Sequence, residues 1–313
     1  MSASLVFDIC LVVLILGIGA WTIIVDKAFA AVIGFVVYGL SLAIAWVRLS
    51  AVDVALTEAA IGGGMTGMLM LGAVARLRVA KVNDAGTSWS VRAVAAFLCV
   101  LIAASLATPI LLPPEVIPSL APTVTENLAQ TGLGNPVAGV LFVYRSLDTL
   151  LEKVVLLLAL LGIWSLAPDR AWGGKPGLRV YAQPNSTLIF LAQLLPPIGI
   201  VVAIYMCWVG AKDPGGAFQG GTVLAAMWLL VIIAGLENAP SIGQRWLRAL
   251  LVVGPLLFLA IGLAGLVLAN AFLAYPAGYA KPMIVAVEVA LTLSIGVALG
   301  MLAAGPPEQA RRQ

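Results

Sequence analysis

The sequence predicts an all-α, polytopic membrane protein with about nine transmembrane helices. Of its 313 residues, 62% are hydrophobic and only 10% are charged, and the mean hydropathy is +1.10. The apolar residues form repeated runs of about 20, which is the length a helix needs to cross a bilayer. Because these runs are continuous rather than alternating, they predict helices and exclude the strands of a membrane barrel.

The first three spans are predicted at 4–25, 28–47 and 53–75, within a first module of residues 1–91. The chain start has no basic segment and no small-residue cleavage site, so the first span is expected to be a retained helix rather than a signal peptide. The basic, polar linker 76–91 closes this module.

The second module, residues 92–186, is predicted to contain two spans, 92–112 and 147–167. Between them lie a proline-rich outer loop, 113–134, and a short apolar piece, 135–146. That piece is too short to span a membrane, so we expect it to lie along the outer interface or to re-enter.

The third module, residues 187–313, follows a linker rich in proline and glycine at 168–186. Its four spans are predicted at 187–209, 219–236, 248–271 and 281–303.

The distribution of Lys and Arg between alternate linkers predicts the orientation. One side receives twelve of these residues and the other four, while Lys153 lies inside a span. The twelve are Lys27, Arg76, Arg78, Lys81, Arg92, Arg170, Lys175, Arg179, Arg245, Arg248, Arg311 and Arg312, and the four are Arg48, Arg145, Lys212 and Lys281. By the positive-inside rule the N-terminus is outside, the C-terminus is cytoplasmic, and the inner (plasma) membrane is the expected location.

Composition excludes several kinds of chemistry. The chain has no histidine, which removes His-based metal sites, haem ligands and proton shuttles. Its three cysteines, Cys10, Cys99 and Cys207, fall in separate apolar runs and are expected to be small buried residues. No nucleotide-binding loop or nucleophile–base pair is present, so we expect no enzyme activity, cofactor, bound metal or nucleic-acid partner.

The third span carries two carboxylates, Asp53 and Glu58, followed by Gly62, Gly63 and Gly64. The carboxylates are five residues apart and therefore do not share a helix face. Asp53 fits either a helix cap or an ion path. Glu58 lies deeper and fits either reversible protonation or a structural ion pair with a neighbouring helix. The glycine triplet permits a helix break, a π-bulge or a close helix approach.

Span five begins with Asp148, Glu152 and Lys153, and the last span contains Glu288. Asp148 and Glu152 share a helix face, and Asp148 is expected to be interfacial. Lys153 could pair with Glu58, Glu152 or a carboxylate of another protein chain, or extend to the interface. Glu288 has no basic residue near it in its own span, where Lys281 stands only at the first position, and it needs a partner from elsewhere.

Residues 214–221 cannot form an ordinary helix because proline and glycines dominate them. The relevant residues are Pro214, Gly215, Gly216, Gly220 and Gly221. Either they form a tight outer hairpin that lets two helices pack closely, or their free backbone groups bind an ion.

Three stretches resemble one known family. Residues 53–64 resemble the signature of the small MbhD-like module found in Mrp-type sodium/proton antiporters and membrane-bound hydrogenases. Residues 144–152 resemble the MbhE-like module, and residues 214–221 resemble the hallmark of the MnhB-like component of these antiporters. Those modules have three, two and four spans in this order, and the first two are similar to the J-type subunit of complex I.

The resemblance implies a membrane subunit of a multisubunit monovalent cation (Na+)/proton antiporter. It implies that Asp53, Glu58, Asp148 and Glu152 line an ion or proton path, with Lys153 modulating them. The expected partners are a large proton-translocating subunit, which this chain lacks, a small K-type subunit, the bilayer, and the ions Na+ and H+. Two alternatives are a membrane-arm subunit of a hydrogenase- or complex-I-like redox pump, and a packing scaffold without an ion path.

Overall fold

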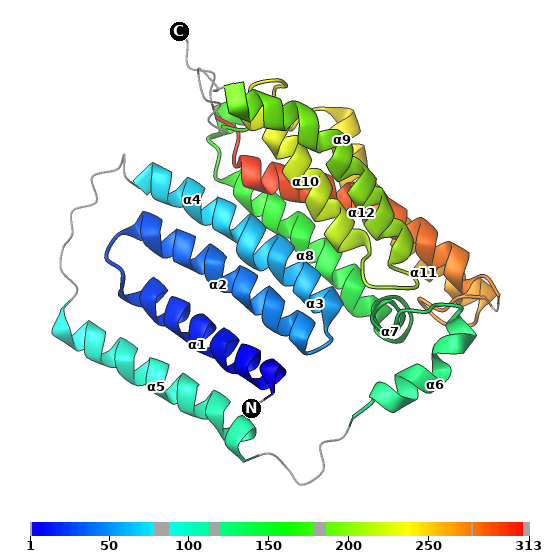
Figure 1. Cartoon of the computed structure of the whole chain (residues 1–313). Helices are drawn as coiled ribbons and strands as arrows, with labels where there is room; N and C mark the ends of the chain where they lie inside the picture. Colours follow the sequence, from blue (N-terminus) through cyan, green and yellow to red (C-terminus); the bar gives the residue numbers. More distant parts are fainter. Residues whose placement is uncertain (1, 78–87, 113–118, 178–185, 277, 309–313) are drawn as a thin grey trace.

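The computed structural model describes residues 2–77, 88–112, 119–177, 186–276 and 278–308, and these form a bundle of helices (Figure 1). Within these ranges the only β-type pairing is an isolated bridge between Pro176 and Pro307. The predicted linkers 76–91 and 168–186 and the loop 113–134 each fall partly outside the described residues.

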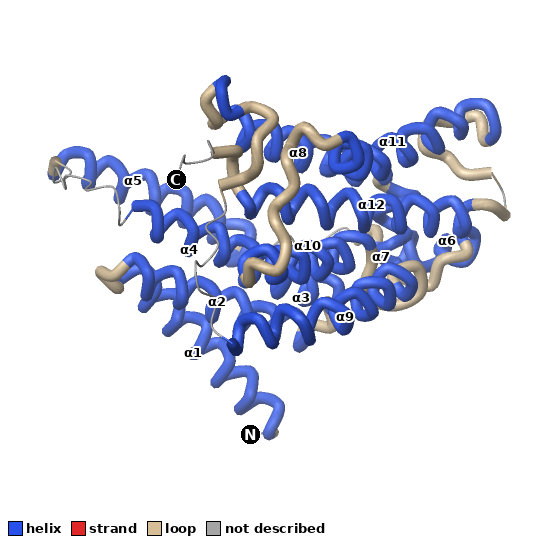
Figure 2. The backbone as a smooth tube through the Cα atoms, turned by 90° about the horizontal axis from the view of Figure 1, so that it is seen from above, coloured by secondary structure: helices blue, strands red, loops and turns tan. Residues whose placement is uncertain are grey.

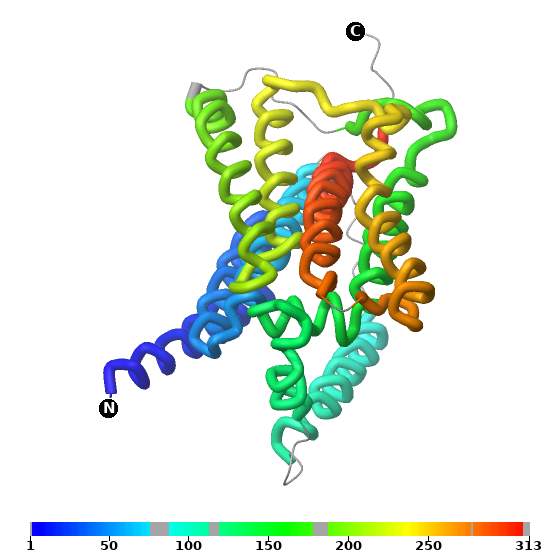
Figure 3. Tube along the Cα trace, turned by 90° about the vertical axis from the view of Figure 1, so that its right-hand side faces the viewer, coloured from blue at the N-terminus to red at the C-terminus, as the bar shows by residue number. Residues whose placement is uncertain are grey.

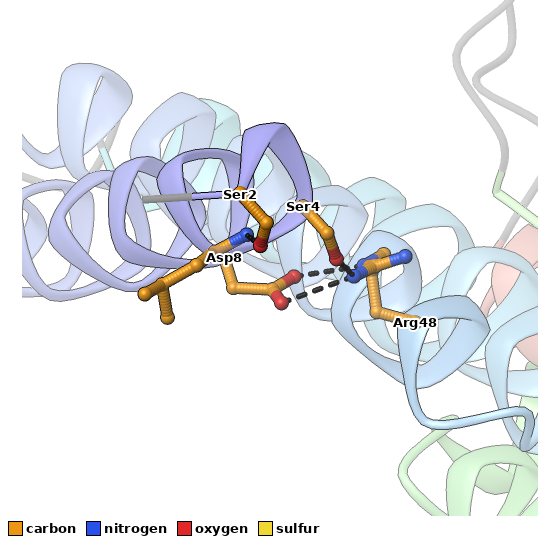
Figure 4. A network of polar contacts seen from close by, with 5 residues as sticks. Ser2, Ser4, Asp8 and Arg48 are labelled. Atoms are coloured by element: carbon orange, nitrogen blue, oxygen red, sulfur yellow. Dashed lines mark hydrogen bonds and ion pairs between the residues drawn. The ribbon is translucent and has the colours of Figure 1, made fainter.

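The first module is a helical hairpin followed by a composite span. Its elements are α1 (Ala3–Ile24), α2 (Ala28–Arg48), α3 (Val52–Thr57), a π-helix (Glu58–Met65) and α4 (Thr66–Leu77). Arg48 ties the hairpin together, because its Nε donates to Asp8 Oδ1 at 2.8 Å and its Nη2 to Ser4 Oγ at 2.7 Å (Figure 4). The Ser2 hydroxyl accepts from the Leu5 amide and caps α1.

The middle of the chain contains α5 (Trp89–Leu111), α6 (Ala121–Thr131), α7 (Pro136–Gly139), a π-helix (Val140–Tyr144) and α8 (Ser146–Ser165). Helix α5 has no buried residue. It stands at the edge of the molecule, separated from the other helices (Figure 1). Helix α7 runs across the bundle and is seen end-on in Figure 1. Helix α7 and the π-helix after it therefore lie across the ends of the long helices.

The last part contains a 3₁₀ helix (Asp169–Ala171), α9 (Ser186–Val209), α10 (Ala217–Ile233), α11 (Arg245–Leu268) and α12 (Ala280–Ala304). Helix α12 is the most buried of these and packs against α8, α9, α10 and α11. Phe258, Leu291 and Ile295 belong to the main hydrophobic core around it, and Leu160 and Leu247 to a second core. Seen from above, α3, α7 and α10 meet in the middle of the molecule (Figure 2).

The predicted all-α, polytopic membrane fold is confirmed, and each of the nine predicted spans corresponds to a helix or to the composite α3–π–α4 segment. Seven of them are long and apolar enough to cross a membrane, as judged by length and composition. Helix α10 has only 17 residues, and α8 contains Asp148, Glu152 and Lys153. Helix α1 begins at one end of the bundle and α12 ends at the opposite one, as an odd number of spans requires (Figure 3).

Two expectations need correction. The outer loop 113–134 contains an amphipathic helix, α6, which has Pro122 in its first turn and is followed by Gly132 in the left-handed conformation. Cys10 and Cys99 are exposed rather than buried, because they lie on outward-facing surfaces of α1 and α5; Cys207 is buried as expected. The orientation of the chain across the membrane stays a prediction.

Candidate functional site

Asp53 lies where the three predicted modules meet. Its Oδ1 accepts a hydrogen bond from the Gly215 amide at 2.9 Å, and its Oδ2 accepts one from Asn135 Nδ2 at 3.3 Å. The capping position of α3 is held by Ala51, and no side chain caps it. Asp53 is therefore in the first turn but binds other segments instead of capping its own helix.

Asn135 is the residue that sequence reasoning missed. It is 4% exposed, and its Nδ2 also lies 3.2 Å from the carbonyl oxygens of Gly210 and Asp213. Its Oδ1 accepts from the Val137 amide at 2.9 Å, which caps α7. An Asn followed by Pro136 is a typical helix start. That signal predicts the cap but gives no indication of the contact with Asp53.

The glycine-rich turn before α10 is a tight hairpin. The expectation that residues 214–221 avoid an ordinary helix is wrong for 217–221, which begin α10 because Gly220 and Gly221 pack against neighbouring helices. Gly215 and Gly216 have backbone φ angles of +153° and +125°, which residues other than glycine rarely adopt. The Gly216 amide donates to the Met206 carbonyl at 2.9 Å. A Cβ on Gly220 would lie 2.9 Å from the Ala203 carbonyl oxygen, so this glycine lets α10 approach α9 closely. The turn also directs the Gly215 amide at Asp53, so that amide is already hydrogen-bonded.

A cavity of about 300 Å³ opens beside this junction and collects six of the predicted site residues, four of them ionisable. Its ionisable side chains are those of Asp53, Glu152, Lys153 and Glu288. Phe218, Gln219 and Asn135 also line it. Three carboxyl groups and one amine in an otherwise apolar helical bundle form a site that suits cations or protons.

Lys153 and Glu152 form an ion pair inside this cavity. Lys153 Nζ lies 3.0 Å from Glu152 Oε1, and the two side chains are 6% and 50% exposed, respectively. The same ammonium lies 4.6 Å from the centre of the Phe218 ring. The geometry is that of a cation–π contact, which adds to the stabilisation of a buried charge. Of the partners considered for Lys153, the structure selects Glu152.

Glu288 is the most deeply buried carboxyl of the site. It is 1% exposed, and its Oε2 has no hydrogen-bond partner among the described residues. A Cβ on Gly216 would lie 3.5 Å from Glu288 Oε1, which places the carboxyl against the glycine turn. Burial, and secondly the negative charge of Glu288, raise the pKa of Tyr275 in the loop before α12.

Glu58 and Asp148 lie outside the cavity. Glu58 sits over Gly62 in its own helix and faces Gly39 of α2, where an added Cβ would lie 3.4 Å from Glu58 Oε1. It therefore occupies a different face of the span from Asp53. Asp148 is 56% exposed and forms an ion pair with Arg145, which is 72% exposed.

The glycine triplet lies within the π-helix Glu58–Met65. A Cβ on Gly39 would lie 2.9 Å from the Gly63 amide nitrogen, so α2 and the π-helix are in close backbone contact. A π-helix has wider turns than an α-helix and is frequent at functional sites. The irregularity and Glu58 are thus at one position in the span.

Two family models match the chain. Residues 187–304 match the domain related to the MnhB subunit of Na+/H+ antiporters, and residues 13–79 match the MbhD family of MBH components. The chain is thus a helical membrane protein that carries these two kinds of domain. It contains an MbhD module and an MnhB module, which lie within the predicted first and third modules.

Solved structures share its fold. A chain of the Mrp complex from Dietzia sp. DQ12-45-1b superposes with a TM-score of 0.74 at 23% identity, over 97% of this chain and 35% of that one. A chain of the membrane-bound sulfane sulfur reductase, an archaeal respiratory membrane complex, gives a TM-score of 0.55 at 23% identity. That match covers 67% of this chain and 95% of the other.

A curated relative is an uncharacterized protein of Methanocaldococcus jannaschii, 28% identical over 170 residues. The match covers 49% of this chain and 65% of that protein. The chain thus spans about a third of the Dietzia chain and about two thirds of the curated relative.

Proposed function

We propose that this chain is an Mrp-type subunit of a multisubunit monovalent cation/proton antiporter and that the 300 Å³ cavity is a segment of its ion or proton path. The observation that carries the proposal is the gathering of Asp53, Glu152, Lys153 and Glu288 around one cavity. Ionisable side chains in a membrane are costly, and they usually mark a pathway for ions or protons.

Each side chain has a distinct part in this proposal. Glu152 is half exposed and exchanges protons or cations with the outer solvent, whereas Glu288 receives them at the buried end. Lys153 lies beside Glu152 and balances part of the negative charge. Asp53 is held by Gly215 and Asn135 and keeps the cavity in shape.

Glu58 belongs to a second part of the path in this proposal, on the side of α2. Glu58 is the first residue of the π-helix, and a switch of this segment to an α-helix would rotate the residues that follow it. Asp148, exposed beside Arg145, is an entry residue.

The partners we propose are a large proton-translocating subunit and a small K-type subunit, in the inner (plasma) membrane. The ions are Na+ and H+, driven by their gradients and by a membrane potential worth about 2.3 kcal/mol per charge per 100 mV. The length of the Dietzia chain supports a large partner, because this chain matches only 35% of it.

The test is cation-driven proton movement in vesicles that contain the complex purified through a tag on this chain. We expect Glu152→Gln, Glu288→Gln and Glu58→Gln each to lower the rate at least about tenfold. Glu126→Gln, on an exposed face of α6, is the matched control and should transport normally. If the three variants assemble and transport like the control, the chain is a packing scaffold and the ion path is wrong.

A redox-driven pump is the second candidate, favoured by the likeness to a chain of an archaeal respiratory membrane complex. A mild-detergent pull-down of the tagged chain, followed by mass spectrometry, separates the two. Recovery of antiporter-like subunits without iron–sulfur proteins supports the exchanger. Recovery of iron–sulfur subunits supports the pump instead.

A further inference from the structure

A second cavity, of about 410 Å³, lies between α8 and α11, near the end of the molecule where α8 ends and α11 begins. Figure 3 shows these two helices side by side. The walls of this cavity are almost entirely apolar and include Leu157, Leu161, Leu251 and Val252. None of the ionisable residues of the ion-path cavity lines it.

The mouth of this cavity carries a basic group. Arg248 lines the cavity, and its Nε donates to the Ile242 carbonyl at 3.0 Å, which fixes the guanidinium beside the opening. Arg248 forms no ion pair with any described residue. Two nitrogen atoms of its planar group therefore stay available for an anion, and arginine matches phosphate in charge and geometry.

One exposed tryptophan lines this cavity, and another lies at the start of α11. Trp172 lines the cavity and is 53% exposed, and Trp246, next to the first residue of α11, is 50% exposed. Exposed tryptophans at helix ends are typical of the interface between hydrocarbon and headgroups. The cavity mouth thus lies at the depth of lipid phosphates and ester groups.

Trp164 supplies a polar atom without a partner. It lines the cavity near the last turn of α8, is 4% exposed, and its indole Nε1 has no hydrogen-bond partner among the described residues. A buried N–H donor without an acceptor is unfavourable, and the described protein offers no acceptor at this position. A ligand that carries an oxygen just below an anionic group would satisfy it.

We infer that this cavity binds an anionic phospholipid, with one acyl chain between α8 and α11. Its phosphate contacts Arg248, and an ester oxygen accepts from Trp164 Nε1. The apolar walls fit the chain, and the arginine at the mouth favours a lipid with net negative charge over a zwitterionic one. Arg245 and Arg248 lie on the predicted cytoplasmic side, where anionic lipids attract basic residues.

The test uses the complex purified through this chain and stripped of lipid in detergent. Phosphatidylglycerol and phosphatidylcholine with the same acyl chains are added separately. Bound lipid is measured by native mass spectrometry, and the unfolding midpoint is recorded. We expect phosphatidylglycerol to bind about tenfold more tightly, and Arg248→Gln to remove most of this preference.

Two further variants test the position of the lipid. Trp164→Phe keeps an aromatic ring but removes the unpaired donor and some volume. It should weaken phosphatidylglycerol binding, and its unfolding midpoint without lipid measures the separate loss of packing. Val252→Trp fills the cavity and should abolish retention of the lipid. Lys27→Gln removes one positive charge on the same predicted side, away from the cavity, and should change nothing.

Three results of the lipid-binding measurements would overturn the inference. The first is equal binding of both lipids by the unmodified protein. The second is an equal loss of the preference for phosphatidylglycerol in Lys27→Gln and Arg248→Gln, and the third is full lipid retention in Val252→Trp. A photocrosslinker attached at Val252→Cys that captures another protein of the complex instead of lipid would also overturn it. The lipid site does not depend on the ion path, because the two cavities share no lining residue.

Discussion

The backbone amide of Gly215 donates a hydrogen bond to Asp53 Oδ1 at 2.9 Å, across 162 residues of sequence. Asn135 Nδ2, from the middle of the chain, reaches the other oxygen of the same carboxyl at 3.3 Å. One side chain in the first turn of α3 therefore connects all three predicted modules. The ion-path cavity lies directly beside this connection.

Replacing Asp53 should loosen the connection between the modules. Hydrogen bonds to charged groups contribute about 1.5–3 kcal/mol each. Asp53→Ala removes two acceptors and leaves the Gly215 amide without a partner, so we expect a loss of about 2–4 kcal/mol in unfolding free energy. The measurement is thermal or denaturant unfolding of the purified complex in detergent. Asp26→Ala, at an exposed position between α1 and α2, is the control, and equal effects of the two variants would refute the structural role.

The turn at Gly216 should not tolerate a side chain. Its φ of +125° is strained for alanine, at a cost of about 1–3 kcal/mol. Gly216→Ala should lower stability by that amount and disturb the carboxyl of Glu288 next to it. Gly72→Ala is the matched control, because nothing lies within 4 Å of an added Cβ there and alanine favours the helix. A Gly216→Ala protein as stable as the control would contradict the geometry of the turn.

The Glu152–Lys153 pair should respond asymmetrically to mutation. Glu152→Gln leaves the buried ammonium of Lys153 without its ion-pair partner, whereas Lys153→Met leaves a carboxylate that is half exposed. We expect Glu152→Gln to cost about 1–2 kcal/mol, reduced by solvent screening on the exposed side, and Lys153→Met to cost less. The unfolding free energies of the two single variants and of the double variant give the coupling free energy between Glu152 and Lys153. Equal costs would argue against a buried lysine.

The close contact between α2 and the π-helix predicts a steric effect. Gly39→Val places atoms within about 3 Å of the Gly63 backbone and should cost about 1–3 kcal/mol by overpacking. It should also raise hydrogen exchange of the Glu58–Met65 amides. Gly17→Val in α1, where an added Cβ has open space, is the control. Unchanged exchange in Gly39→Val would mean that the two segments do not touch.

The helices could be predicted from sequence because each apolar run has the length of a membrane span and is separated from the next by polar or glycine-rich residues. Helix α6 was missed because it has 11 residues, low hydrophobicity and prolines just before it. Its stability comes from packing of one face, which a search for spans does not detect.

The site could be predicted only in part. The ionisable residues Asp53, Glu152, Lys153 and Glu288 were visible in apolar runs, but their meeting around one cavity depends on how α3, α8 and α12 pack. Glu58 shows where prediction from sequence ends. Its position deep in the third span was evident, but the orientation of its side chain toward α2 depends on the π-helix. Asn135 is an uncharged residue in a connecting segment, and only the fold reveals its contact with Asp53.

The junction of Asp53, Asn135 and Gly215 also bears on how the subunit is made. Because Asp53, Asn135 and Gly215 belong to one polypeptide, every copy of the protein contains one of each. The bonds that close the junction are then intramolecular, with an effective concentration on the order of millimolar for a short flexible tether. Synthesis of the chain therefore delivers this part of the complex preassembled, with no search between separate proteins in the bilayer.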